Sequence, residues 1–378
     1  MEQRRVGFGR ILLEWGRIGV TGFGGPPAHI ALLRRLCVER NEWISEREFE
    51  DSIAACNLLP GPASTQLAIH SAYRVGGLVG AVVGGLAFII PGLIAIVALA
   101  VLFLAESPPE LVLALGAGAA AAVPAVAVSA GVNLARPSRS TASTHLRWII
   151  YVLFGVLAAA VTGPYVVLVL LMCGFVEIAA TRTGYTSASP FLLGTISVAT
   201  TGGLMALAWT AFKVGALSYG GGFVIIPLMQ NDAVSAHHWM TESQFLNAVA
   251  LGQVTPGPVV LTVAVVGYAA AGVGGAMLAA AIAFGPSFII VLAGARHFDA
   301  LRTNDTVRGF LRGAGPAALG AILGAAIPLT LALDHAWQTV VLAAAIIWTA
   351  GLRKGVVPCL LLAAVAGAAV MAFGGSVA

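Results

Sequence analysis

Residues 78–105 read LVGAVVGGLAFIIPGLIAIVALAVLFLA, an apolar run that holds no charged side chain. About 20 residues suffice to cross the hydrocarbon core of a bilayer as a helix, and residues 111–135 form a second run of this kind. Strands of a membrane barrel would instead alternate apolar and polar residues over short segments, and neither run alternates. These stretches therefore predict transmembrane helices.

The composition of the whole chain agrees with these two runs. Of its 378 residues, 59% are hydrophobic and only 10% are charged, whereas a soluble domain is roughly a quarter charged. Too few polar side chains are present to cover a water-facing surface, so lipid must be the solvent. We predict an all-α polytopic membrane protein.

Charge and cysteine content argue against several classes of function. The formal net charge is +4, and no basic tract indicates a nucleic-acid partner. The four cysteines form no CxxC pair, so neither a disulfide framework nor a metal site is predicted. No motif of nucleophilic, phosphate-binding or metal-dependent catalysis appears, and we expect neither an enzyme nor a cofactor.

An internal repeat relates the two halves of the chain at a shift of 196 positions. The stretch NLLPGP at 57–62 falls on QVTPGP at 253–258. Such self-similarity decides architecture, and we predict two domains, 1–185 and 186–378. Further identical pairs in this register are Gly19 with Gly215, Trp43 with Trp239, Glu46 with Glu242 and Phe49 with Phe245.

Positive charges indicate that the two repeats are inverted in the membrane, because Lys and Arg mark cytoplasmic loops. The loop at 31–50 holds four Arg residues, whereas its counterpart at 227–246 holds no Lys or Arg. The turn at 105–110 holds no base, whereas its counterpart at 296–308 holds three Arg residues. We predict a cytoplasmic N-terminus and inverted repeats, a design typical of secondary transporters, with the site at the repeat interface.

This inversion predicts nine crossings and four helical hairpins that enter and leave on one side of the membrane. The hairpins are expected at 10–30, 50–74, 210–228 and 246–270. The spans are expected near 76–104, 110–134, 147–163, 164–181, 190–208, 274–295, 308–333, 336–351 and 355–374. Each hairpin could instead be a tilted span.

Each half carries two signatures of a broken helix, GFGGPP at 22–27 with SYGGG at 218–222, and the Pro-Gly-Pro pair. Pro stops one helix and suits the first turn of the next. A restarted helix offers free N–H groups and a positive dipole end to an anion. A packing kink is the alternative, but four motifs at two-fold-related positions favour binding. The candidate substrate-binding residues in these motifs are Gly24, Gly25, Asn57, Pro60, Gly61, Pro62, Ser64, Thr65, Gly220, Gly221, Gln253, Thr255, Pro256, Gly257 and Pro258.

Arg17 and Lys213 are the candidate charges of the site, because they occupy equivalent positions just before the glycine motifs. Lys213 lies in an apolar run, 204–217, with no acid nearby in the sequence. An unpaired cation inside a membrane is costly and indicates function by default. A base that snorkels to the membrane surface is the alternative interpretation.

Glu46 and Glu242 occupy equivalent positions three residues after a Trp. We expect Ser45 and Thr241 to be helix N-caps, which places both acids in a favourable first turn. Proton carriage by these acids is the less favoured alternative.

The quoted motifs closely resemble those of the chromate ion transporter family. The resemblance rests on GFGGP at 22–26, WISEREF at 43–49 and NLLPGP at 57–62. It continues in the second half, where QVTPGP at 253–258 is similar to the family's C-terminal domain, and it covers nearly the whole chain. The second half departs from the pattern because no Pro-Pro pair follows its glycines.

The resemblance implies efflux of chromate, and of sulfate-like oxyanions, across the inner (plasma) membrane of a prokaryote. The membrane potential or the proton gradient would drive it. The partners are then an oxyanion and the lipid bilayer, and a homodimer is left open. Three alternatives remain: a transporter or channel for a different anion on the same scaffold, a receptor-like protein without alternating access, and a membrane enzyme.

Overall fold

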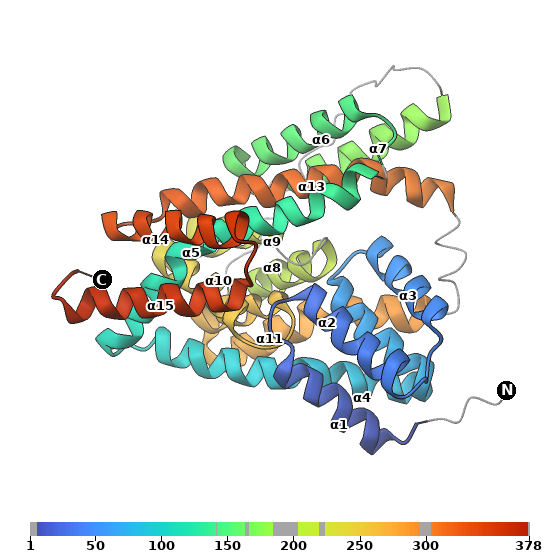
Figure 1. Cartoon of the computed structure of the whole chain (residues 1–378), viewed down its shortest axis with the longest axis horizontal. Helices are drawn as coiled ribbons and strands as arrows, with labels where there is room; N and C mark the ends of the chain where they lie inside the picture. Colours follow the sequence, from blue (N-terminus) through green and yellow to red (C-terminus); the bar gives the residue numbers. More distant parts are fainter. Residues whose placement is uncertain are drawn as a thin grey trace.

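The computed structural model describes residues 6–140, 142–162, 166–183, 203–218, 224–294 and 304–376, and every regular element in these ranges is a helix (Figure 1). The all-α prediction is confirmed. The first half contains α1 (Phe8–Thr21), α2 (Pro26–Arg34), α3 (Glu46–Leu58), α4 (Ala63–Phe103), α5 (Glu110–Ser140), α6 (His145–Leu157) and α7 (Val166–Thr183). The second half contains α8 (Leu204–Leu217), α9 (Ile225–Gln230), α10 (Glu242–Val254), α11 (Thr262–Gly294), α13 (Asp305–Leu331), α14 (Ala336–Ile346) and α15 (Val356–Ala372). The predicted domain boundary after residue 185 and most of the predicted span at 190–208 lie outside the described residues.

The repeat recurs in the backbone at the same shift as in the sequence. α2 continues into a π-helical turn at Arg35–Arg40, and α9 continues into one at Asn231–Ala236. After each turn a non-glycine residue takes a positive φ, 50° at Glu42 and 51° at His238. Both conformations are rare, so their recurrence in register confirms the prediction of two repeats.

The helix starts at α3 and α10 are also equivalent. Ser45 Oγ accepts from the N–H of Glu48, and Thr241 Oγ1 accepts from the N–H of Gln244. Gln244 bonds back to the Thr241 N–H, which completes a capping box. Both predicted N-caps are confirmed.

Both Pro-Gly-Pro loops interrupt a helix, as their sequences predict. α3 ends at Leu58 and α4 starts at Ala63 behind the N-cap Pro62. The central glycines take φ values of +117° at Gly61 and +96° at Gly257, a region that residues with a side chain rarely adopt.

α4 and α11 each fold back on themselves at a glycine. Gly77 has φ +67° and Gly272 has φ +62°, both far from helical values. Beyond the first kink the chain returns past itself, because a Cβ at Gly80 would lie 2.7 Å from the carbonyl oxygen of Ala72. Each helix therefore has a short arm before the glycine and a long arm after it. α3 and the short arm of α4 flank the first Pro-Gly-Pro loop, and the re-entrant hairpin expected at 50–74 stays a prediction.

The first helix of each half packs on the long helix of the same half, α1 on α4 and α8 on α11. Equivalent glycines lie at these contacts: a Cβ at Gly19 would come within 2.7 Å of the Phe88 carbonyl oxygen, and one at Gly215 would collide with that of Ala283. Small residues let helices in a membrane approach closely, where dispersion contacts replace the hydrophobic effect.

The last helices of each half pack on the opposite half. α6 and α7 pack on α13, while α14 and α15 pack on α5 (Figure 1). α5 and α13 are themselves equivalent and lie side by side, with Gly131 against Leu323. The halves are therefore interlocked, and a surface between them is available for a site.

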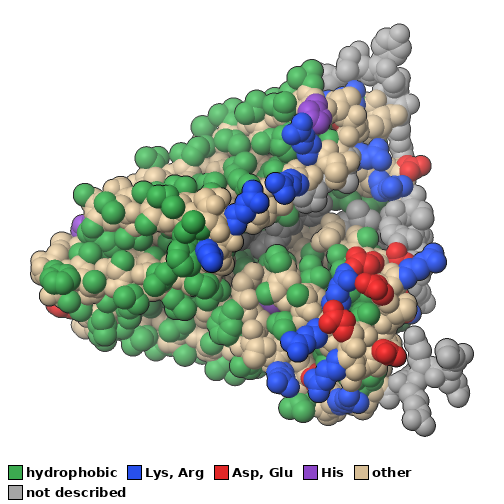
Figure 2. Space-filling view, viewed as in Figure 1, with side chains coloured by type: hydrophobic (Ala, Val, Ile, Leu, Met, Phe, Trp, Pro, Cys, Tyr) green, Lys and Arg blue, Asp and Glu red, His purple; other side chains and the backbone are tan. Residues whose placement is uncertain are grey.

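Apolar side chains cover most of the visible face, and charged side chains gather at one end of it (Figure 2). Four described helices are long and apolar enough to cross a membrane, namely α4, α5, α13 and the helical stretch Val259–Gly294. Five shorter apolar helices accompany them in the described ranges. These features belong to a multi-pass membrane protein, and the expected nine crossings stay a prediction.

Candidate functional site

A cavity of about 780 Å³ lies between the first Pro-Gly-Pro loop, the end of α5 and the first half of α13. Figure 2 shows the molecule hollowed between its upper and lower groups of helices, with Lys and Arg side chains along the upper edge. The cavity is lined by Cys56, Asn57, Leu59, Gly61, Ala63, Leu134, Ser138, Ser140, Ala142, Ser143, Arg308, Leu311, Arg312, Gly315, Pro316, Ala318, Leu319 and Ile322. The structure thus brings two predicted site residues, Asn57 and Gly61, to one cavity.

The start of α4 presents free backbone donors at this cavity. The N–H groups of Thr65 and Gln66 both bond to the Pro62 carbonyl oxygen. The N–H groups of Gly61, Ala63 and Ser64 have no hydrogen-bond acceptor among the described residues. Because the positive end of the helix dipole adds to these donors, this helix start suits an anion.

Two arginines of α13 line the same cavity. Arg308 and Arg312 are four residues apart, which places them on one face of the helix. Arg312 is half-buried, and neither guanidinium forms an ion pair with a described residue. Among the described residues no Asp or Glu lines the cavity, and its two charged side chains are both arginines.

Sequence reasoning did not select Arg308 or Arg312 as site residues. In the sequence, Arg308 indicates only the cytoplasmic side, as one of the three Arg residues at 296–308. The signal was nevertheless present, because Arg312 interrupts an apolar helix and its equivalent in the first half is Gly116. The same rule that selected Lys213, an intramembrane base without a neighbouring acid, applies to Arg312.

Buried polar groups support the loop from behind. Gln66 is fully buried and donates from Nε2 to the Pro60 carbonyl oxygen over 2.6 Å. The hydroxyls of Thr65 and Ser287 are buried without a hydrogen-bond partner among the described residues. Ser287 Oγ would lie 3.2 Å from a Cβ on Gly61. Unpaired buried hydroxyls are uncommon, and these lie beside the loop and helix start whose Gly61, Ala63 and Ser64 N–H groups have no acceptor among the described residues.

The second Pro-Gly-Pro loop is closed in this structure. The Gly257 N–H donates to the Gly22 carbonyl oxygen over 3.0 Å. Pro256 packs its carbonyl on Gly92, where a Cβ would collide with it. The predicted residues Gln253, Thr255 and Gly257 are buried and do not line the cavity. Equivalent loops therefore differ, one open to a cavity and one sealed.

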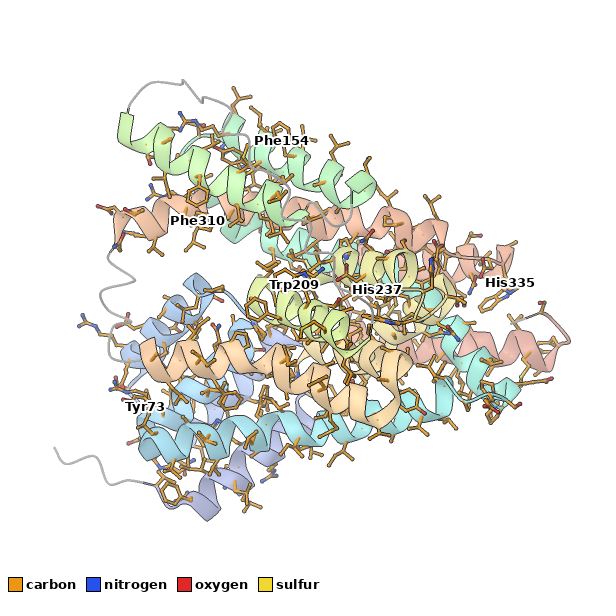
Figure 3. The ribbon with its side chains drawn as sticks, turned by 180° about the vertical axis from the view of Figure 1, so that it is seen from behind. Tyr73, Phe154, Trp209, His237, Phe310 and His335 are labelled. Carbon is orange, nitrogen blue, oxygen red and sulfur yellow. The ribbon has the colours of Figure 1, made fainter. Side chains whose placement is uncertain are left out.

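The expectation that Lys213 is unpaired is wrong. Its Nζ lies 2.5 Å from Oδ2 of Asp232, and Thr210 donates to the same oxygen over 2.8 Å. The acid was missed because it lies 19 residues further along the chain, in the π-helical turn after α9. Lys213 does not line the cavity. Lys213 Nζ lies 6.0 Å from the ring centroid of Trp209, which is on the same helix and is labelled in Figure 3.

Arg17, the equivalent of Lys213, is exposed on α1 and does not line the cavity. Its guanidinium has no ion pair with a described residue. Both Arg17 and Lys213 stay predicted substrate-binding residues, and neither is part of the site built here.

The predicted anion site at the start of α2 is weakened by its own sequence. Pro26 and Pro27 have no N–H, and the next two N–H groups, of Ala28 and His29, bond to the carbonyl oxygen of Gly25. The helix start therefore lacks the free donors that define such a site. Gly220 and Gly221, in the equivalent motif, lie outside the described residues.

Glu46 and Glu242 both lie in the first turn of an exposed helix start, far along α3 and α10 from the Pro-Gly-Pro loops. Glu46 also accepts from Arg34 over 3.0 Å. This arrangement agrees with the capping role.

Comparison with known proteins agrees with the resemblance in the sequence. The family model described as chromate transporter matches residues 9–178 and 205–372. The chain is 30% identical over 337 residues to the chromate transport protein of Cupriavidus metallidurans, covering 85% of this chain and 82% of that protein. It is 30% identical over 346 residues to the chromate transport protein of Pseudomonas aeruginosa, covering 86% and 81%. No solved structure matches the chain. Because the family model spans both repeats, the chain belongs to the chromate transporter family.

Proposed function

We propose that the protein exports chromate, or a related tetrahedral oxyanion, from the cytoplasm across the inner membrane. The observation that supports this binding site is the cavity between the first Pro-Gly-Pro loop and α13. It is lined by two arginines that pair with no described acid, and no described acid lines it. The free N–H groups of Ala63 and Ser64 would bind one side of the anion, and Arg312 the other. Arginine suits this task because its planar donors bind an oxyanion in a bidentate manner.

The side on which the cavity opens supports the direction. Arg308, Arg312 and the turn after α5 line or border it, and excess Lys and Arg mark the cytoplasmic side. The sealed loop at Gly257 lies in the opposite repeat, which the inversion directs to the other side. This conformation is then the one that accepts the anion from the cytoplasm.

The energetics favour export without a coupled ion. Moving one charge through 100 mV is worth about 2.3 kcal/mol, and a dianion that leaves a negative interior gains about twice that. Proton coupling is compatible with this mechanism but is not required by it.

Inverted membrane vesicles test the proposal, because export then appears as uptake. We expect saturable uptake of chromium-traced chromate that rises with an inside-positive potential, and inhibition by sulfate if it shares the site. Saturable uptake of another anion, with chromate ineffective, would assign the scaffold to that anion. Uptake that rises linearly with concentration would indicate a channel, and binding without uptake would indicate a receptor.

A further inference from the structure

A chain of hydrogen bonds connects the open cavity with the sealed loop. His29 is fully buried, with Nε2 2.9 Å from the Gly22 carbonyl oxygen and Nδ1 3.3 Å from Ser64 Oγ. The Gly22 carbonyl also accepts from the Gly257 N–H. One side chain therefore joins the start of α4, which borders the cavity, to the seal of the second Pro-Gly-Pro loop.

The direction of each bond in this chain follows from its chemistry. A carbonyl oxygen can only accept, so Nε2 carries the hydrogen, and in the neutral ring Nδ1 is then an acceptor. Ser64 must therefore donate its hydroxyl hydrogen to His29. Ser64 has no hydroxyl donor left for an anion as long as this bond exists.

The residues around His29 hold its imidazole ring in the orientation that forms both hydrogen bonds. Phe88 contacts it edge to face, with ring centroids 5.0 Å apart. A Cβ on Gly22 would lie 2.8 Å from the His29 ring, so only glycine leaves room for it. The equivalents of His29 and Ser64 in the second half are Ile225 and Val260, which cannot form the chain. The His29–Ser64 connection therefore belongs to the first repeat and has no counterpart at the equivalent positions of the second repeat.

We propose that His29 is a positioning residue that couples oxyanion binding at the start of α4 to the release of the Gly22–Gly257 seal. This inference rests on the proposed function. An oxyanion at the Ala63 and Ser64 N–H groups attracts the Ser64 hydroxyl hydrogen. When Ser64 turns to the anion, Nδ1 loses its donor, the ring loses one of its two anchors, and the seal loosens. The anion thereby opens its own exit.

Two variants interrupt the chain at different bonds. His29→Leu removes both bonds at similar volume, whereas His29→Gln keeps an N–H donor for Gly22 and an oxygen acceptor for Ser64. Ser64→Ala removes only the hydroxyl and keeps the backbone N–H that binds the anion. Ser71→Ala is the matched control, because Ser71 is buried on the same helix and its hydroxyl forms no hydrogen bond with a described residue.

The experiment compares equilibrium binding of chromate to purified protein with maximal uptake in vesicles, both normalised to inserted protein. In both variants the seal is already loose before the anion binds, so binding no longer triggers its opening and fewer molecules begin a cycle from the cytoplasmic side. We therefore expect His29→Leu and Ser64→Ala to lower the maximal rate about tenfold while the affinity for chromate changes less than about twofold. A simple loss of binding would instead lower the affinity. The double variant should be no slower than either single variant. His29→Gln should keep most of the rate, and Ser71→Ala all of it.

Three outcomes overturn the inference: wild-type rates in Ser64→Ala, additive losses in the double variant, or equal losses in His29→Gln and His29→Leu. If His29→Leu does not insert, Ser64→Ala decides alone. Failure of the proposed function is distinct, because the wild-type protein would then take up no chromate. The same variants would be compared with the anion that it does transport.

Discussion

At the scale of single residues, Arg312 carries the strongest expectation for substrate binding. It is half-buried, it forms no ion pair in the part of the chain that the structure describes, and no described acid lines its cavity. Arg312→Gln should weaken chromate binding about 10- to 150-fold, the factor that corresponds to loss of a charge-assisted hydrogen bond of about 1.5–3 kcal/mol. Equilibrium binding to purified protein measures this change. Arg136→Gln is the matched control. Arg136 is an exposed base near the end of α5 that borders the cavity, but it does not line the cavity itself.

The alternative site at this scale is the predicted pair, Arg17 and Lys213. If Arg312→Gln binds chromate as the wild-type protein does while Arg17→Gln does not, the binding site is assigned to Arg17 and Lys213 instead. Comparison of the three variants therefore separates the site built from the structure from the one predicted from the repeat.

Lys213 carries a second expectation, which concerns stability. It pairs with Asp232 inside the protein, and removing one partner of a buried ion pair costs about 3–5 kcal/mol because the other charge stays buried. Lys213→Gln should therefore lower the melting temperature in detergent, and Lys213→Gln with Asp232→Asn should recover part of the loss. Unchanged melting with weaker chromate binding would instead give Lys213 a substrate-binding role.

At the scale of elements, the two Pro-Gly-Pro glycines should not tolerate a side chain. Gly61 and Gly257 have positive φ values, and a Cβ on Gly61 would lie 2.6 Å from Gln66 Nε2. Gly61→Val and Gly257→Val should abolish uptake while much of the protein still inserts, measured by transport per inserted molecule. Gly274→Val is the control, because a Cβ there meets no atom within 4 Å and its φ is not positive. Normal transport by both loop variants would remove the loops from the mechanism.

The sequence predicted the helix breaks well because their causes are local. Pro-Gly-Pro stops and restarts a helix whatever surrounds it. Ser45 and Thr241 likewise cap α3 and α10 through bonds to residues only three positions further along the chain. Contacts between distant segments were not predictable in the same way. Arg312 and Gly61 line one cavity only because α13 of the second half packs beside the first half. The pairing of Lys213 with Asp232 likewise depends on how α8 meets the turn after α9.

At the scale of the whole molecule, the packing of helices from each half on the other half couples the motions of the two halves. α7 packs on α13 and α15 packs on α5, so each half holds helices of the other. A shift of one repeat must therefore be accompanied by a shift of its partner. The present conformation has the first loop open and the second sealed, and exchange of these two states between equivalent loops would alternate the access of a single site.

This exchange requires that the two repeats face opposite sides of the membrane, which is a prediction about orientation. Equivalent positions such as Glu39 and Ser235 should then lie on opposite sides, Glu39 in the cytoplasm, because its loop is rich in arginine and the loop of Ser235 contains no Lys or Arg. Both side chains are exposed, and the four native cysteines are buried, so the wild-type chain serves as the blank. In right-side-out vesicles, a membrane-impermeant maleimide should label Ser235→Cys and leave Glu39→Cys unmodified until the membrane is permeabilised. Inverted vesicles should give the opposite result. Labelling of both cysteines from one side would leave the repeats parallel, and a pseudo-two-fold in the membrane plane could no longer exchange the open and sealed loops.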